Sequence, residues 1–292
     1  ACIDAAVSGV DECVMAPGTY HEPINFLGKA ITVRSSSGRD LTMIGATGHY
    51  GSVITCQHGE GPNTLLDGFT ITGGWGGVGG FDEVTGGGMY NYRSSPTVIN
   101  CKFSENSAIG FSGGAGGGMY NEYSNPTVTN CIFERNTTNG SGGGMCNVDS
   151  LPTVTDCVFS GNTAIEYGGI GGGMANWYSS PTVANCTFNG NAAGYLAGGM
   201  ANRDSDLTLT NCTFSGNTAA GSFGGIFGGG MYNSIGTLAT MTNCIFWGNS
   251  PDEIVNRETV VPTIRFSDVQ GGLPVGAVDG GGNIDLDPMF MR

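Results

Sequence analysis

The sequence predicts an all-β chain that folds as one parallel β-solenoid, and three observations lead to this fold class. Glycine supplies 54 of the 292 residues, which disfavours helices because an interior glycine costs about 1 kcal/mol relative to alanine. Six copies of a unit of about 28 residues follow one another, and such repeats are typical of solenoids. Within each unit, β-branched and aromatic residues alternate with polar ones, as in half-buried strands.

Each repeat contains a Gly-Gly-Met box, a cysteine, a phenylalanine and an asparagine in fixed order. In the first repeat, the box at residues 86–91 precedes Cys101, Phe103 and Asn106. The variation in length lies almost entirely between this asparagine and the next box. The methionines of the boxes are Met89, Met119, Met145, Met174, Met200 and Met231.

The period-two pattern predicts which side chains fill the interior. We expect Val154, Cys157 and Phe159 to point inward and Thr153 and Val158 to point outward, because alternate strand residues face opposite sides. Stacked coils lie about 4.8 Å apart, so equivalent residues form ladders along the axis. The predicted ladders are the methionines, the row from Val98 to Leu209, the phenylalanines and the cysteines Cys101, Cys131, Cys157, Cys186, Cys212 and Cys244.

An asparagine precedes five of the six ladder cysteines, and Asp156 precedes the other. Asparagine tolerates the left-handed backbone of a tight bend, and its side-chain amide can bond to the copy one coil away. We therefore expect a corner ladder of Asn100, Asn130, Asn185, Asn211 and Asn243.

The whole chain, 1–292, reads as one domain of about eight to nine coils. Residues 1–12 are expected to form a short N-terminal cap, 13–85 less regular coils, 86–249 the six repeats and 250–292 an irregular C-terminal cap. Caps are needed because an open solenoid end exposes strand edges and core. No signal peptide is visible and the chain begins in what reads as the middle of a segment, so we expect a processed product.

Composition excludes several classes of function. The net charge of −14 argues against nucleic-acid binding, which uses a basic surface. No apolar run approaches the roughly 18 residues that indicate a membrane-spanning helix. Apolar residues make up 39% of the chain, which argues against disorder.

The motifs resemble a known group of proteins. Gly-Gly-Gly-Met-Tyr-Asn, followed by Ser-Pro-Thr-Val and Asn-Cys-x-Phe-x-x-Asn, is similar to repeats of right-handed parallel β-helix proteins of the pectate-lyase-like superfamily. Residues 2–20, 66–72 and 282–288 also resemble parts of such proteins, and the repeats are similar to polymorphic outer-membrane adhesins. The resemblance implies a single-stranded right-handed β-helix that is secreted or displayed on the cell surface. The group contains polysaccharide lyases, hydrolases, adhesins and other surface proteins.

The resemblance implies that a lyase would hold Ca²⁺ on clustered carboxylates and use a lysine or arginine as base. The repeats contain only four basic residues, in no such arrangement, and the three histidines His21, His49 and His58 show no triad or zinc spacing. We therefore assign no catalytic residue and expect no enzyme and no cofactor. Asp279, Asp285 and Asp287 remain a weak candidate site for calcium.

The two residues after each box asparagine form the best candidate for a binding face. Stacked in register, they bring aromatic rings beside carboxylates and two arginines, which suits a glycan. An ordinary solvated face is the alternative. The candidate residues are Tyr92, Arg93, Glu122, Tyr123, Asp149, Trp177, Tyr178, Arg203 and Asp204.

The glycine-rich loops between repeats carry large apolar residues that the register places on one edge. Monomers rarely expose a contiguous apolar patch of more than a few hundred Å², so these loops either cover one another or meet a partner. We expect an association edge formed by Trp75, Phe81, Phe111, Tyr167, Ile170, Tyr195, Phe223 and Phe227.

The ten cysteines are expected to fall into different chemical states. The six ladder thiols are expected to be buried and reduced, because stacked Cβ atoms lie roughly 5 Å apart and a disulfide needs about 3.8 Å. Cys2 and Cys13, near the N-terminus, are candidates for a disulfide. Cys146 occupies a position that is tyrosine or alanine in other repeats, and we expect a surface or semi-buried thiol there.

These features favour a structural or interaction protein of the cell surface or extracellular matrix, which assembles through its apolar loop edge or its ends. Its partner would be itself, another surface protein or a polysaccharide. A polysaccharide lyase or glycoside hydrolase is one alternative, and a non-catalytic glycan-binding or adhesin module is the other. An enzyme predicts a groove with converging carboxylates over the candidate face, whereas a structural protein predicts a flat one.

Overall fold

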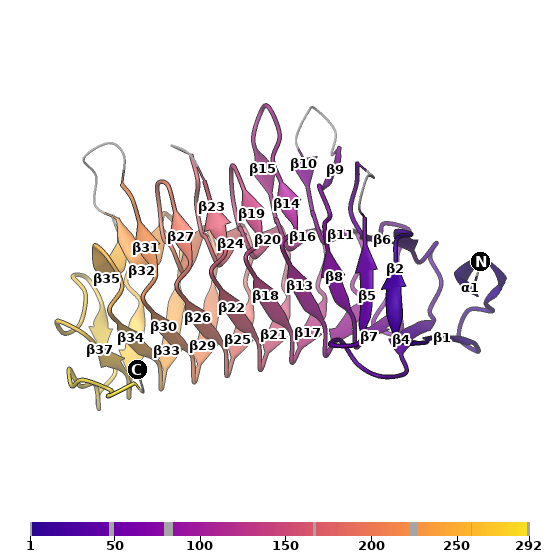
Figure 1. Cartoon of the computed structure of the whole chain (residues 1–292). Helices are drawn as coiled ribbons and strands as arrows, with labels where there is room; N and C mark the ends of the chain where they lie inside the picture. The colour runs from indigo at the N-terminus through magenta and orange to yellow at the C-terminus, as the bar shows by residue number, and fades with distance from the viewer. Residues whose placement is uncertain are drawn as a thin grey trace.

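A computed structural model describes residues 2–46, 50–78, 84–165, 168–221, 227–257 and 259–290. The chain winds into a solenoid whose coils stack along one axis, with the N-terminus at one end and the C-terminus at the other (Figure 1). Apart from the short helix α1 (Cys2–Ala5), the regular structure of these residues is β-strand. The predicted all-β solenoid is confirmed.

Three long parallel sheets run along the solenoid. Sheet A contains β1 (Glu12–Met15), β4 (Thr32–Ser35), β7 (Leu65–Asp67), β12 (Thr97–Ile99), β17 (Thr127–Thr129), β21 (Thr153–Thr155), β25 (Thr182–Ala184), β29 (Leu207–Thr210), β33 (Ala239–Thr242), β36 (Thr263–Arg265) and β38 (Val278–Asp279). Sheet B contains β2 (Gly18–Tyr20), β5 (Thr42–Gly45), β8 (Thr70–Thr72), β13 (Lys102–Ser104), β18 (Ile132–Glu134), β22 (Val158–Ser160), β26 (Thr187–Asn189), β30 (Thr213–Ser215), β34 (Ile245–Trp247) and β37 (Asp268–Val269). Sheet C contains β3 (Ile24–Asn25), β6 (Ile54–Cys56), β11 (Met89–Tyr92), β16 (Met119–Glu122), β20 (Met145–Val148), β24 (Met174–Trp177), β28 (Met200–Arg203), β32 (Gly228–Ser234) and β35 (Asp252–Asn256).

Two short sheets are formed by the segments that lead from sheet B to sheet C. Sheet D contains β9 (Gly77–Val78), β10 (Val84–Thr85) and β15 (Gly114–Ala115), of which β9 and β10 are antiparallel. Sheet E contains β14 (Ser107–Ala108), β19 (Thr137–Thr138), β23 (Thr163–Ala164), β27 (Ala192–Ala193) and β31 (Thr218–Ala219).

The predicted ladders fill the core. Phe159 is fully buried between Phe133 and Phe188, with ring centroids 4.7 Å away on both sides. Val154 and Cys157 are buried as expected, whereas Val158 is 38% exposed. Glycines of the Met box allow the coils to approach this closely. A Cβ added at Gly118 would lie 2.5 Å from the carbonyl oxygen of Gly144 in the next coil.

The predicted asparagine ladder occupies the corner between sheets A and B. Asn130 has a left-handed φ of 52°, and its Nδ2 donates to Oδ1 of Asn100 at 2.8 Å. The structure adds two buried asparagine ladders that the sequence analysis does not predict. One stacks the box asparagines from Asn91 onward, and the other stacks the asparagines that follow the phenylalanines, from Asn106 onward. The amides of the second ladder also bond to backbone groups, since Nδ2 of Asn136 donates to the carbonyl oxygen of Phe103 and its Oδ1 accepts from the N–H of Asn106.

The two ends of the solenoid are built differently. At the N-terminal end, α1 is tied to β1 by a disulfide between Cys2 and Cys13, the pair considered as a candidate. At the C-terminal end the sequence motif stops after residue 249, yet β35, β36, β37 and β38 still extend the three long sheets. Backbone pairing continues because it depends on the path of the chain rather than on the motif. Among the described residues, no helix has the length and apolarity to cross a bilayer.

Candidate functional site

The candidate binding face is the outer surface of sheet C. In each strand the methionine and asparagine of the box are buried, so the residue between them and the residue after the asparagine point outward. Strand pairing places Tyr92, Glu122, Val148, Trp177 and Arg203 in one row along the axis. The structure therefore brings the first residue of each predicted pair of the binding face into one row, which we call the stripe.

The second residue of each predicted pair lies at the corner after the strand. Each has a left-handed backbone, with φ between 47° and 52°. Left-handed non-glycine residues are uncommon and can mark strain at a functional site. Here the conformation recurs in five successive coils, so it belongs to the corner of the coil. The residues are Arg93, Tyr123, Asp149, Tyr178 and Asp204.

Tyrosine rings form a platform on the first two of these coils. Tyr90 and Tyr120 are parallel, with centroids 5.9 Å apart, and Tyr90 also stacks on Tyr92 at 6.5 Å. The guanidinium of Arg93 lies over the rings of Tyr92 and Tyr123, at 5.1 and 5.8 Å from their centroids. Desolvation raises the pKa of Tyr90, and the charge of Glu122 adds to the effect. The platform is thus a partly desolvated aromatic surface beside a carboxylate.

The ring stack stops at the next coil. Cys146 stands in register with Tyr120, and Ala175 follows in the coil after it. A hollow of about 270 Å³ lies here, bounded on the sheet side by Tyr120, Cys146, Val148 and Trp177. We call this hollow the slot. Its loop side is formed by Ser112, Gly113, Gly114, Ala115, Gly140 and Ser141.

Beyond the slot, loops of the chain itself cover the same face. Isolated bridges pair Ala115 with Ser141, Ser141 with Ile170, and Ile170 with Leu196, so these four residues form one row above sheet C. Ile170 and Leu196 pack on a cluster that contains Ala201. The row therefore has small side chains beside the slot, at Ala115 and Ser141, and large side chains beyond it, at Ile170 and Leu196. The covered cluster consists of Ala197, Ala201, Tyr232 and Val255.

The residues of the predicted association edge differ in their exposure. Phe111 is fully exposed on the loop that projects between β14 and β15 (Figure 1), and Trp75 is 53% exposed. Ile170 instead packs against the covered cluster. Phe227 is buried and contacts the ring of Tyr195 at 5.5 Å. Phe81, Tyr167 and Phe223 lie outside the described residues.

Comparison with known proteins agrees with this architecture. Residues 141–269 match the family model for the right handed beta helix region. The chain is a right-handed β-helix. Its fold is shared with a pectin methylesterase from carrot, 12% identical with a TM-score of 0.50 over 97% of this chain and 83% of that one. It is also shared with pectate lyase Pel9A, 15% identical with a TM-score of 0.52 over 96% of this chain and 72% of the other.

No curated protein sequence matches the chain. The pectate-lyase-like resemblance, first carried by the repeat motifs, is thus confirmed for the fold. At identities of 12% and 15%, it shows the architecture of the β-helix alone. The chemistry of the face must be argued from its own residues.

The cysteines of the β-helix agree with the expectations in all but one case. The six ladder thiols are buried and form no disulfide, and burial raises the pKa of Cys131 well above its usual value. Cys56 is buried in the same core. The expectation for Cys146 is wrong, because its side chain is only 1% exposed. The neighbouring Tyr120 and Ala175 pack beside it and shield it from solvent.

Acidic side chains do not converge on the face. Within the described ranges, no group of three or more His, Cys, Asp and Glu residues could hold a metal ion. The aspartates of the weak calcium candidate are exposed. Asp279 accepts hydrogen bonds from Gly281 and Asn283, and Asp287 accepts one from Met289. His49 lies outside the described residues.

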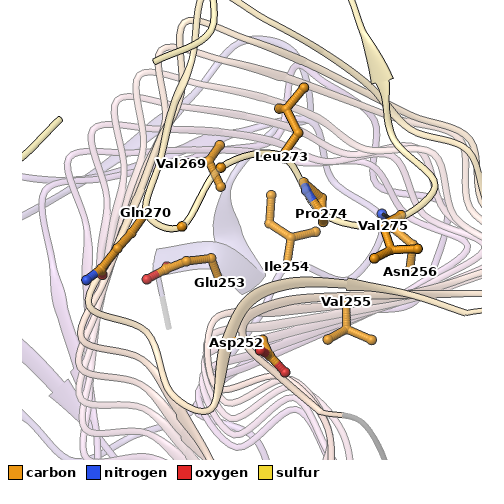
Figure 2. Close-up of a pocket in the computed structure, with 12 residues that line it drawn as sticks. Asp252, Glu253, Ile254, Val255, Asn256, Val269, Gln270, Leu273, Pro274 and Val275 are labelled. Atoms are coloured by element: carbon orange, nitrogen blue, oxygen red, sulfur yellow. Dashed lines mark hydrogen bonds between the residues drawn. The ribbon is translucent and has the colours of Figure 1, made fainter. Parts of the chain in front are cut away.

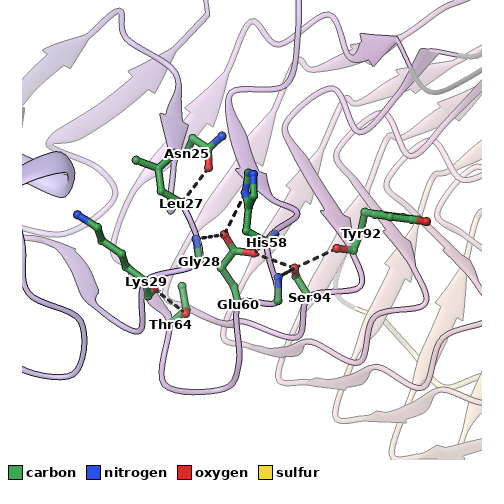
Figure 3. A network of polar contacts seen from close by, with 10 residues as sticks. Asn25, Leu27, Gly28, Lys29, His58, Glu60, Thr64, Tyr92 and Ser94 are labelled. Carbon is green, nitrogen blue, oxygen red and sulfur yellow. Dashed lines mark hydrogen bonds and ion pairs between the residues drawn. The ribbon is translucent and has the colours of Figure 1, made fainter.

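Glu60 is a buried carboxylate that sequence reasoning missed (Figure 3). It accepts hydrogen bonds of 2.8 Å from the N–H groups of Gly28 and His58 and from the hydroxyl of Ser94. Burial alone would raise the pKa of Glu60, but these donors outweigh burial and the pKa is lowered. Because its partners come from three coils, Glu60 holds the N-terminal coils together.

A second hollow, of about 490 Å³, lies at the C-terminal end of the β-helix (Figure 2). Figure 2 shows Glu253 and Ile254 pointing from β35 toward the core, with Leu273 and Pro274 above them. Glu253 ends the second buried asparagine ladder, because the backbone N–H and the side-chain amide of Asn249 both donate to its carboxylate. Burial raises the pKa of Glu253, and the charge of Asp252 adds to the shift. The hollow is thus the end of the core, where a carboxylate closes a ladder.

Proposed function

We propose that the chain is an extracellular or cell-surface protein that binds a saccharide in the slot without catalysing a reaction. The observation that carries the proposal is the interrupted ring ladder. Tyr90 and Tyr120 stack, and the next two positions in register hold only Cys146 and Ala175. Tyr120 and Cys146 are themselves buried, so a ring-shaped ligand would lie in the slot beyond them and against Trp177.

The lining of the slot favours a sugar over a purely apolar ligand. Binding sites typically combine apolar and aromatic walls with a few polar groups that fix orientation. The slot has aromatic walls in Tyr120 and Trp177 and hydroxyl groups in Ser112 and Ser141. A pyranose presents C–H groups on its faces and hydroxyls at its edge, which matches both kinds of lining. Tyr92 and Arg203, in the same row, would lie along a longer chain.

The charged groups of the face favour binding over catalysis. Glycoside hydrolysis uses two carboxyl groups that flank one bond, and the acidic residues here are spread along successive coils. Arg203 is paired with Asp204 at 3.5 Å, and Arg93 lies over two tyrosine rings. Both cations are thus held by the protein itself.

A glycan array tests the proposal. The wild type is expected to bind a subset of oligosaccharides, and Trp177→Ala is expected to remove that binding because it takes away one wall. Tyr178→Ala is the matched control, since this neighbouring ring is exposed and does not line the slot. Equal binding by both variants and the wild type would exclude the slot as the site.

Self-association is a second candidate function, favoured by the complete exposure of Phe111 on its projecting loop. Among the described residues of the edge, Ile170 and Phe227 pack inside the chain, whereas Phe111 and Trp75 are exposed and available for such a contact. Light scattering on the wild type and on Phe111→Ser tests it. A concentration-dependent mass that Phe111→Ser abolishes would support assembly, whereas a monomer at every concentration would exclude it.

A further inference from the structure

The outer face of sheet A carries two rows of threonine. In the six strands from β12 to β33, the core-facing residue is fully buried, so the residues on either side of it point outward. Strand pairing aligns these outward residues in two rows along the axis. The first row is threonine throughout: Thr97, Thr127, Thr153, Thr182, Thr208 and Thr240. The second row holds Thr129, Thr155, Thr210 and Thr242, with Ile99 and Ala184 at the other two positions.

A preference for strand-forming residues does not account for these rows. Threonine is favoured in strands generally, so propensity alone would place it equally on sheet B of the same coils. The outward rows of sheet B are instead mixed in character, and Lys102 pairs there with Glu134 at 2.8 Å. The outward rows of sheet A from β12 to β33 contain no Lys, Arg, Asp or Glu, although the chain has a net charge of −14. Sheet A thus presents an uncharged surface of hydroxyl and methyl groups.

The threonines are regularly spaced in two directions. Neighbouring strands of a sheet lie about 4.8 Å apart, and alternate residues of one strand lie about 6.6 Å apart. The pairing from β12 to β33 keeps one register, so the rows stay in line over six coils. Both spacings are close to the two repeat distances between oxygen atoms on the prism face of hexagonal ice.

The threonine side chain suits the ordering of water on such a lattice. From Thr127 to Thr240 the first row is exposed, so its methyl and hydroxyl groups reach solvent. A hydroxyl can both donate to and accept from water, and a methyl group restricts the orientation of the water beside it. In the second row, the hydroxyls of Thr129 and Thr155 bond to each other at 2.9 Å, which holds the two side chains in place. Water between the rows would therefore be ordered by both.

We infer that the outer face of sheet A binds the surface of an ice crystal. This inference is independent of the proposed saccharide site, which lies on sheet C. A polysaccharide is a poorer occupant of sheet A, because its outward rows from β12 to β33 contain no aromatic residue on which a sugar ring could stack. Water held between the two rows joins the crystal, and the bound protein then blocks further growth of the ice beneath it.

The growth of ice in the presence of the protein tests the inference. We expect the wild type to lower the freezing point below the melting point in a nanolitre osmometer and to keep ice grains small during annealing. Thr182→Tyr should abolish both effects, because a large ring above the rows keeps the surface away from the ice. Thr187→Tyr is the matched control, since it makes the same change in the same coil but on sheet B. It should retain full activity.

A second variant gains activity, which misfolding cannot imitate. Ala184→Thr fills the position between Thr155 and Thr210 in the second row and should widen the gap between freezing and melting. Trp177→Ala, which alters the saccharide site, should leave this gap unchanged. A wild type that neither opens the gap nor limits grain growth would overturn the inference and leave the saccharide proposal intact. Full activity in Thr182→Tyr, or equal losses in Thr182→Tyr and Thr187→Tyr, would overturn it as well.

Discussion

The outer face of sheet C has two parts built on the same repeat. In the open part the loops leave the slot, although Tyr120 and Cys146 are buried beneath them, and in the covered part the loops pack on the sheet. In the open part, small residues in the row above the sheet, Ala115 and Ser141, leave the slot over Cys146. In the covered part, Ile170 and Leu196 occupy the same row and pack on the cluster around Ala201. The outward side chains of the strands and the side chains carried by the loops differ between the two parts, while the strands keep one register.

This difference shows how a repeat protein can acquire a binding site. The core ladders fix the sheet, because each coil must match its neighbours in register. The loops are free of this constraint and can add or omit one large side chain. The slot exists because a ring is missing from the Tyr90–Tyr120 stack and a large residue is missing from the row above it.

The largest effect expected from the comparison concerns Tyr232, which is 4% exposed in the covered part. Tyr232→Ala should reduce the free energy of unfolding by about 2–4 kcal/mol, because it leaves a cavity beneath the loops. Tyr178→Ala removes a ring that is 55% exposed and should change stability by less than about 0.5 kcal/mol. Urea unfolding of both variants measures the difference, and equal losses would show that the covered part is not packed.

Exchanging large and small side chains in the row above sheet C should uncover the covered part and fill the slot in the open part. Leu196→Ser uncovers apolar surface and is expected to cost about 1–2 kcal/mol in unfolding free energy. Ser141→Leu places the larger side chain over the slot and should abolish saccharide binding with little change in stability. Calorimetric titration of both variants checks this, and undiminished binding by Ser141→Leu would place the ligand elsewhere.

The buried carboxylates near the two ends should respond to pH in opposite directions. The pKa of Glu60 is lowered, so its contribution to stability is present above the unfolded pKa and is lost as pH falls through the folded value. The pKa of Glu253 is raised, so its ionisation destabilises the fold as pH rises through the folded value. At neutral pH, Glu60→Gln should therefore destabilise the protein and Glu253→Gln should not.

Urea midpoints across the acidic range measure this contrast. As the pH is lowered, Glu60 reduces the stability of the wild type and Glu253 increases it. Glu60→Gln should therefore make the loss of stability toward low pH smaller, and Glu253→Gln should make the gain toward low pH smaller. Identical pH profiles for the two variants would contradict the assignment of opposite shifts.

The smallest effect is expected at the boundary between the open and covered parts, where Arg203 pairs with Asp204. Both side chains are partly exposed, and such ion pairs contribute about 0–1 kcal/mol. Arg203→Ala should therefore leave the thermal midpoint nearly unchanged. A large drop in that midpoint would mean that the pair helps to hold the two parts together.

The sequence was sufficient for most features that repeat in every coil, although the two buried asparagine ladders were not predicted. The core ladders and the left-handed corner of Asn130 follow from periodicity and from the conformational preference of asparagine. The stripe from Tyr92 to Arg203 was also predictable, because strand register alone places it.

Features that occur once were not predictable from the repeat. The burial of Cys146 depends on its packing with Tyr120 and Ala175, which periodicity does not describe. The position of Ile170 and Leu196 depends on the path of glycine-rich loops, whose backbone has many accessible conformations. Glu60 acquires its role from donors on three different coils. A short polar segment gives no signal for such contacts.

The most direct test of the central claim is a crystal structure of the chain soaked with an oligosaccharide that it binds on the glycan array. The account predicts electron density for a sugar ring in the slot, next to Trp177 and between the sheet and the loop residues Ser112 and Ser141. Density for the sugar at another surface, with the slot filled only by solvent, would contradict the account.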